Sequence, residues 1–200
     1  MDKTNESIFD QFHDWILSNW RTLVWIACIT VLFVAGNSVR SYFNTKFESE
    51  QSELYHTYLS ASRKQQEEIA QNMLNNRHSN YHVLIALWET KKYFDEANYT
   101  DAKKWLQWAS EHNDNKILGD LINYRMLNLC YQTSDHKCIE KMSQKLIKTA
   151  YAPLALFIEA QNNVTQHNST VAISQLEQAM QKTDDKMLKL IFSTNIMALK

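Results

Sequence analysis

A stretch of 18 uncharged residues separates Arg21 from Arg40, and the rest of the chain is polar by comparison. A helix of this length rises about 27 Å, close to the ~30 Å thickness of the hydrocarbon core of a bilayer. The run therefore predicts one transmembrane helix over residues 22–43. Residues 1–21 form a short segment before it, and residues 44–200 follow it.

The residues that flank this run suit the two surfaces of a membrane. Trp20 and Trp25 lie at one end and Tyr42 at the other, and aromatic rings concentrate at the headgroup level. Arg21 and Arg40 can extend their charged ends to the headgroups while their stems stay in the apolar layer. We predict that these five residues form the membrane anchor.

A cleaved signal peptide and a buried core helix are the alternatives for the same run. A signal peptide begins with a positively charged region, whereas residues 1–21 carry a formal charge of −2. Residues 34–36 offer only a weak cleavage site. A retained anchor is the favoured interpretation.

The first segment has an amphipathic pattern of its own. Phe12 and Trp15 share an apolar face over residues 6–17, with Asp10 and Asp14 opposite. Such a segment either lies on the membrane surface and contacts a partner there, or simply begins the anchor helix early. Phe12 and Trp15 are therefore candidate partner contacts.

Glycine and proline are scarce, being limited to Gly36, Gly119 and Pro153. Strand-rich folds need many turn residues with positive φ, and nucleotide-binding loops need clustered glycines. The chain is therefore predicted to be all-α. The spacing of apolar residues predicts helices over residues 47–74, 81–95, 100–111, 116–132, 136–148, 153–165, 169–181 and 185–198.

Charge argues against some classes of partner. Residues 41–200 contain 18 basic and 18 acidic residues, so their formal charge is zero. A nucleic-acid-binding domain needs a basic face. We expect no nucleic acid and no small-molecule substrate as partners.

A pattern of three residues recurs in the second half of the chain: a small residue, a large apolar residue four positions later, and a small residue three positions after that. Lys145 departs from it in the second copy. The steps between its copies are 36 and 34 residues, and a period near 34 built from two helices is typical of tetratricopeptide repeats. The pattern predicts a tetratricopeptide-like solenoid of helical hairpins over residues 81–200, after a long helix and connector over residues 44–80. An irregular helical bundle is the alternative. The three copies are Ala102, Leu106 and Ala109, then Cys138, Met142 and Lys145, then Ala172, Leu176 and Ala179.

Two tryptophans occupy positions that are polar in the other copies. Trp105 and Trp108 either pack against the 47–74 helix or contact a partner protein. Packing is favoured because something must cover a terminal repeat. We expect Trp88 in the core of the same pair. In this alignment Trp105 corresponds to Lys141 and Gln175, and Trp108 to Gln144 and Gln178.

Cys130 and Cys138 lie on either side of the break between two predicted helices. In an oxidising compartment they could form a disulfide across the turn, and in a reducing one they would stay thiols that fill small core positions. Both interpretations stay open.

Nothing in the sequence assembles into an active site. His78 and His82 are four residues apart, as zinc ligands on one helix face are, but Ser79 stands where a zinc hydrolase of that type has its glutamate. We predict no catalytic residue, no metal and no cofactor. A membrane-bound metalloprotein or hydrolase that uses this pair is the alternative from another class.

Three stretches and the order of the segments resemble a known family. Residues 98–102, residues 120–127, and residues 155–160 followed by Ala172 carry the resemblance, which spans essentially the whole chain. The chain is similar to the YfgM-type ancillary subunits of the bacterial Sec translocon, SecYEG.

The resemblance implies a single-pass protein of the bacterial inner membrane, with its N-terminus in the cytoplasm and its repeat domain in the periplasm. It implies the Sec translocon channel, periplasmic chaperones and translocating polypeptides as partners, and no enzymatic activity. The charges near the anchor do not fix its orientation, since Lys3 and Arg21 balance Arg40 and Lys46. A scaffold subunit of another envelope assembly complex is the alternative.

Overall fold

The computed structural model describes residues 3–74 and 79–200, and every regular element in these residues is an α-helix. Before residue 32, side chains are described only at Asn19 and Ile29. The all-α prediction is confirmed. The helices are α1 (Lys3–Ser60), α2 (Arg63–Met73), α3 (Asn80–Asp95), α4 (Tyr99–Glu111), α5 (Lys116–Gln132), α6 (His136–Leu146), α7 (Ala152–Thr165), α8 (Ser169–Gln181) and α9 (Lys186–Ala198).

The chain divides into two compact units, Met1–Glu50 and Gln51–Lys200. In the first unit α1 passes through the apolar run without a break. Within the part of the chain that the structure describes, no helix has both the length and the apolarity needed to cross a membrane. Arg40 and Tyr42 are exposed. The other predicted anchor and contact side chains, those of Phe12, Trp15, Trp20, Arg21 and Trp25, lie outside the described residues.

The predicted helix over residues 47–74 is instead two helices, because α1 ends at Ser60 and α2 begins at Arg63. Ser62 starts α2, and the Gln65 side-chain oxygen accepts hydrogen bonds from its backbone N–H (3.1 Å) and its hydroxyl (2.8 Å). The Gln66 amide donates to the Tyr58 carbonyl (2.8 Å), which stabilises the end of α1. Ser-x-x-Gln is a helix-start pattern that the apolar periodicity concealed.

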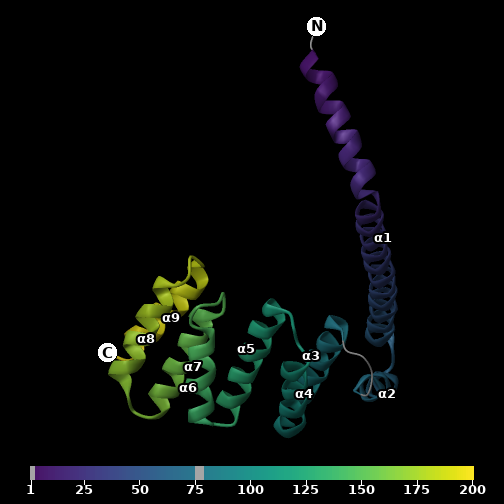
Figure 1. Cartoon of the computed structure of the whole chain (residues 1–200). Coiled ribbons are helices and arrows are strands. Elements are labelled where there is room, and N and C mark those ends of the chain that lie inside the picture. Colours follow the sequence, from purple (N-terminus) through teal and green to yellow (C-terminus); the bar gives the residue numbers. More distant parts are fainter. Residues whose placement is uncertain (1–2, 75–78) are drawn as a thin grey trace. The chain divides into compact units, whose positions relative to one another are not determined.

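The second unit is a succession of helical hairpins (Figure 1). Helices α3 and α4, α5 and α6, and α7 and α8 form the pairs with the most extensive contacts, and α9 packs on α8. Each of α3 to α9 begins and ends within two residues of its predicted boundary. This order of paired helices is consistent with the predicted tetratricopeptide-like solenoid.

All three hairpins turn in the same way. Ala97, Ser134 and His167 adopt positive φ angles of 57°, 53° and 61°. The next residue in each case donates its backbone N–H to a carbonyl five residues back, which is the Schellman arrangement. The turn therefore fixes where the first helix stops and the second starts. These bonds run from Asn98 to Tyr93 (2.8 Å), from Asp135 to Cys130 (2.9 Å) and from Asn168 to Asn163 (2.9 Å).

The turns also set the register of the repeats, and the predicted register of the second copy is wrong by one residue. Counted from the turns, Ile139, Ser143 and Leu146 take the places assigned to Cys138, Met142 and Lys145. Leu146 is fully buried, whereas Lys145 is exposed. The second hairpin thus places a small residue between two large ones, the reverse of its neighbours.

Three apolar clusters follow one another along the second unit. The first joins Tyr58 at the end of α1 to α2, α3, α4 and α5, the second joins α5 to α7, and the third joins α7 to α9. Trp88 is not in this core, contrary to prediction, because 44% of its surface is exposed. Its indole N–H donates to the Tyr55 hydroxyl (3.1 Å), so the polar end of the ring has a hydrogen-bond partner at the surface.

Candidate interaction surface

One hollow lies between the first helices of the second and third hairpins. It has a volume of about 480 Å³ and combines aromatic and aliphatic side chains with amides. Its lining residues are Tyr124, Asn128, Tyr131 and Gln132 of α5, and Leu154, Phe157, Ile158 and Gln161 of α7.

A second hollow of about 340 Å³ lies between α3 and α5. Asn128 and Gln132 line both hollows, so the two are neighbours on either side of α5. We call them together the first-helix groove. The other residues of the second hollow are Thr90, Lys91, Phe94 and Arg125.

The groove has the composition of a peptide-binding surface. Aromatic rings supply large contact areas, and the amides of Asn128, Gln132 and Gln161 both donate and accept hydrogen bonds. Tyr124 is held in place by stacking on Tyr151, with ring centroids 4.9 Å apart. An extended polypeptide offers the matching backbone groups whatever its sequence.

One half-buried cation lies in the groove. The Arg125 guanidinium donates to the Leu87 backbone carbonyl, and burial lowers its pKa from the ordinary value. A guanidinium has five N–H groups and stays charged in proteins, so an occupant's carbonyl or carboxylate oxygen can share it. The exposed Lys91 is paired with Asp95 at 2.5 Å.

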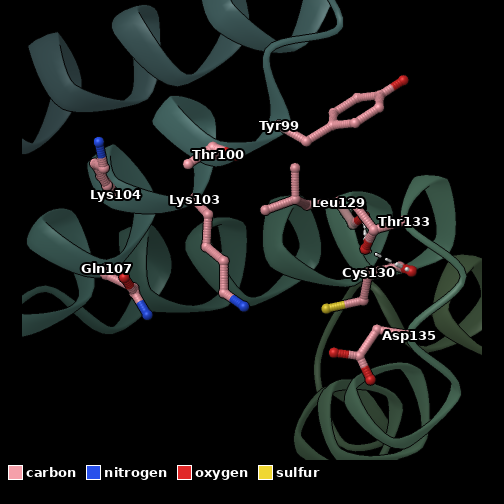
Figure 2. A pocket seen from close by; sticks show the side chains of 9 residues that line it. All are labelled: Tyr99, Thr100, Lys103, Lys104, Gln107, Leu129, Cys130, Thr133 and Asp135. Carbon is pink, nitrogen blue, oxygen red and sulfur yellow. Dashed lines mark hydrogen bonds between the residues drawn. The ribbon is translucent and has the colours of Figure 1, made fainter.

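A third hollow, of about 460 Å³, lies between α4 and the end of α5 (Figure 2). Lys104 is paired with Asp101 (2.8 Å), and the Asp135 carboxylate accepts the Cys138 N–H (3.1 Å). Lys104 and Asp135 thus serve structural contacts at this hollow. It is lined by Tyr99, Thr100, Lys103, Lys104, Gln107, Leu129, Cys130, Thr133 and Asp135.

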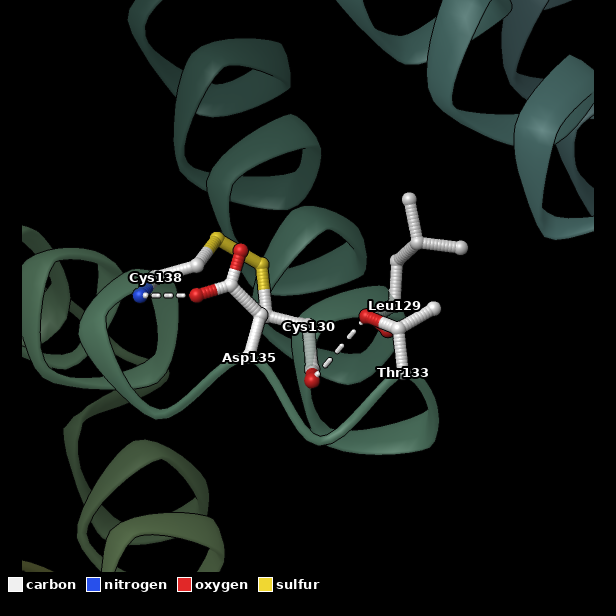
Figure 3. Close-up of a disulfide and its surroundings, with 5 residues drawn as sticks. All are labelled: Leu129, Cys130, Thr133, Asp135 and Cys138. Carbon is white, nitrogen blue, oxygen red and sulfur yellow. Dashed lines mark hydrogen bonds between the residues drawn. A yellow bond between two sulfur atoms is a disulfide. The ribbon is translucent and has the colours of Figure 1, made fainter.

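The two cysteines meet at the turn of the second hairpin (Figure 3). Cys130 lies in the last turn of α5 and Cys138 in the first turn of α6, with Cα atoms 5.7 Å apart and the sulfur atoms joined in a disulfide. Asp135 caps α6 between them. The Thr133 hydroxyl donates to the Leu129 (3.0 Å) and Cys130 (3.2 Å) carbonyls. The disulfide therefore links the two ends of a turn whose conformation is already defined by hydrogen bonds.

The two tryptophans of α4 face α2. Trp105 is 7% exposed in the first cluster, and Trp108 packs against that cluster. Both line a hollow with Leu74 and Tyr93. Trp108 also stacks on the His112 ring, with centroids 4.4 Å apart. The structure thus places Trp105 in the core, and a partner contact by either residue stays a prediction.

Of the two histidines that the sequence offers as a metal pair, only His82 lies among the described residues, and His78 lies outside them. His82 is buried at the start of α3, and its Nδ1 accepts the Ser79 backbone N–H (3.2 Å). Within residues 3–74 and 79–200, as far as side chains are described, no three acidic, cysteine or histidine side chains converge as metal ligands would. The His82 imidazole contributes to the start of α3 through this hydrogen bond.

Sequence reasoning did not single out the groove residues. A signal was present, since Tyr124 and Tyr131 are seven residues apart on one helix face and Phe157 occupies the Tyr124 position one repeat later. Recognising it requires the correct register, which the turns supply and the size pattern does not.

Comparison with protein families agrees with this architecture. The profile of a tetratricopeptide repeat-like domain matches residues 13–138. The chain belongs to this family. Helices α7 to α9 lie beyond the matched residues, yet the tetratricopeptide repeat-like turn recurs at His167. No curated protein and no solved structure matches the chain.

Membership of the tetratricopeptide repeat-like family indicates a protein–protein interaction module. Stacked helical hairpins create extended concave surfaces that such proteins use for binding. Domains of this kind are typically not enzymes.

Proposed function

We propose that this tetratricopeptide repeat-like protein is an ancillary subunit of the bacterial Sec translocon that links translocating chains to periplasmic chaperones. The first-helix groove supports the proposal most directly. It comprises two hollows of aromatic and amide groups, and such a surface suits extended segments of many sequences.

The exposed part of α1 supports a membrane anchor. Ile29, Leu32, Phe33 and Val34 are each between 57% and 71% exposed. Consecutive large apolar side chains on a single helix are unfavourable in water, and a bilayer would remove them from it. With residues 22–43 in the inner membrane, the tether would keep the groove beside the channel, which strengthens weak contacts by raising their effective concentration.

The cysteine pair supports a periplasmic location of the repeats. Disulfides persist in the periplasm, whereas cytosolic thiols are kept reduced. The Cα separation of 5.7 Å lets Cys130 and Cys138 bond without movement of the backbone. The N-terminus would then lie in the cytoplasm.

Site-specific photocrosslinking tests the use of the groove. A photoreactive amino acid at Tyr131, in the groove, should crosslink to a stalled translocating polypeptide. The same probe at Lys141, exposed on the second helix of that hairpin, should not. Equal crosslinking at both positions would rule out the groove as the binding surface.

A second set of probes tests the partner. Probes at residues 8–20 should crosslink to the translocon channel, and contacts with another envelope complex instead would favour the scaffold alternative. A periplasmic reporter joined after Lys200 should be active. Full-length chain that leaves the membrane fraction without detergent would contradict the anchor.

A further inference from the structure

Helix α9 takes the position of the first helix of a fourth hairpin. Its preceding residue, Asp185, lies 34 residues after Tyr151, which precedes α7. The same step separates Gln161 from Asn195, and the Gln161 amide donates to the Asn195 side-chain oxygen (2.9 Å). Phe157 and Phe192 are also in contact, with ring centroids 5.5 Å apart. Helices α7 and α9 are therefore equivalent elements of successive repeats.

The equivalent face of α7 is covered by its second helix. Leu156 and Ala160 are buried in the cluster that contains Ala172 and Leu176 of α8. Shifted by 34 residues, Leu156 becomes Leu190, which is 59% exposed. The face that α8 covers on α7 is thus uncovered on α9 within the described residues.

This face of α9 is apolar along its length. Met187, Leu190, Ile191 and Met197 are all exposed, at spacings that place them on one side of the helix. We call these four residues the α9 stripe. Such an apolar face on a single helix is unfavourable in water, which indicates a surface that another element covers.

The charges beside the stripe indicate what covers it. Helix α9 contains Lys186 and Lys189 and no acidic residue. Residues 182–200 hold four lysines against Asp184 and Asp185, and both aspartates precede the helix. A second copy of α9 would bring like charges together. An acidic partner would complement the positive charge of the lysines beside the stripe.

We propose that the α9 stripe binds an acidic amphipathic helix of another protein, which packs on α9 as α8 packs on α7. The partner helix would present alternating small and large apolar residues to α9, as Ala172, Leu176 and Ala179 do to α7. The α9 stripe and the first-helix groove are separate surfaces. A negative result at one therefore leaves the proposal for the other unaffected.

The test uses full-length protein in detergent and a labelled peptide probe. The probe has the sequence of residues 168–182 with Ser174→Glu, Gln178→Glu and Gln181→Glu, three positions on the exposed side of α8. A matched peptide carries lysine at the same positions. Fluorescence anisotropy should show saturable binding of the acidic probe and about tenfold weaker binding of the basic one.

Variants of the protein localise the binding. Leu190→Gln combined with Ile191→Gln should weaken the acidic probe about tenfold or more. Ile117→Gln, at a residue that is 77% exposed on α5, should leave binding unchanged. Circular dichroism and melting temperature verify that both variants fold.

Three results would overturn the proposal. They are absent binding, binding that survives the α9 substitutions, and a dimer in sedimentation velocity that the α9 substitutions dissociate. The last would show that a second copy of the chain occupies the stripe.

Discussion

The hydroxyl of Tyr58 donates a hydrogen bond to Oε1 of Glu89, 2.5 Å away and 31 residues later in the chain. Both residues are buried, and Lys92 adds an ion pair to the same oxygen at 2.9 Å. Burial, and then the hydrogen bond from its hydroxyl to Glu89, raises the pKa of Tyr58. This contact fixes the last turns of α1 to the first hairpin.

Tyr58→Phe should lower the free energy of unfolding by about 1–3 kcal/mol, because the buried Glu89 carboxylate loses a donor. Tyr55→Phe is the matched control, since its hydroxyl only accepts the Trp88 N–H near the surface. The control should change stability by less than about 0.5 kcal/mol. Denaturant titrations that give equal losses for the two variants would contradict the buried contact.

Glu159→Gln should stabilise the protein at neutral pH. Burial raises the pKa of Glu159, although hydrogen bonds with Ser143 and Gln175 oppose the shift. The folded state therefore holds the proton more tightly than the unfolded chain, so this group's stabilisation is present below the ordinary carboxyl pKa and is lost as the pH rises.

Melting curves of the wild type and Glu159→Gln should accordingly converge near pH 4 and separate toward pH 7. Glu177→Gln, at an exposed position on α8, is the control and should show no such separation. A constant difference across this pH range would mean that ionisation of Glu159 is not the cause.

Ala97→Gly should raise the free energy of unfolding by up to about 1 kcal/mol. Ala97 has a φ of 57°, a conformation that glycine adopts without the steric cost of a Cβ. Ala150→Gly, in the exposed connection after α6, should be neutral or destabilising because it only adds freedom to the unfolded chain. Chemical denaturation distinguishes the two, and a loss of stability in Ala97→Gly would count against the turn geometry.

Ser143→Leu should destabilise the protein by about 1–3 kcal/mol, because Ser143 lies between Ile139 and Leu146 in a filled core. Lys145→Ala should change stability by less than about 0.5 kcal/mol, since Lys145 is exposed. Thermal melts of both variants test the register that the turns define. If Lys145→Ala destabilised the protein more than Ser143→Leu, the alignment through Cys138, Met142 and Lys145 would be correct.

Cys138→Ser should cost about 2–3 kcal/mol if the disulfide forms in the cell, the amount expected for closing so short a loop in the unfolded chain. Reductant should lower the melting temperature of the wild type and leave that of Cys138→Ser unchanged. Thiol-alkylation of protein that is taken from intact cells and denatured under non-reducing conditions should label Cys28 and spare Cys130. Full labelling of Cys130 would place the pair in a reducing environment.

The helices were predictable because the chain is locally consistent. Apolar spacing located α3 to α9 closely, and Asn98, Asn115, Asp135 and Asp185 accept backbone N–H groups at helix starts, as short polar side chains commonly do. The break at Ser62 was missed although its capping pattern was readable, because the apolar periodicity on either side resembled one helix.

The register of the second repeat and the residues of the groove were harder to predict from the sequence. Non-glycine residues such as Ser134 take the left-handed conformation in the turns, where glycine would have signalled it. Size matching then favoured Met142 over Ser143. The groove depends on residues of α3, α5 and α7 meeting in space, and that follows only once the register is known.

The disulfide joins Cys130 to Cys138 inside a single hairpin. Contacts between one hairpin and the next, in the described residues, are noncovalent packing of the α4–α5 and α6–α7 kind. Because each repeat in such an array contacts only its neighbours, reduction of the disulfide would loosen one turn and leave the packing between hairpins in place.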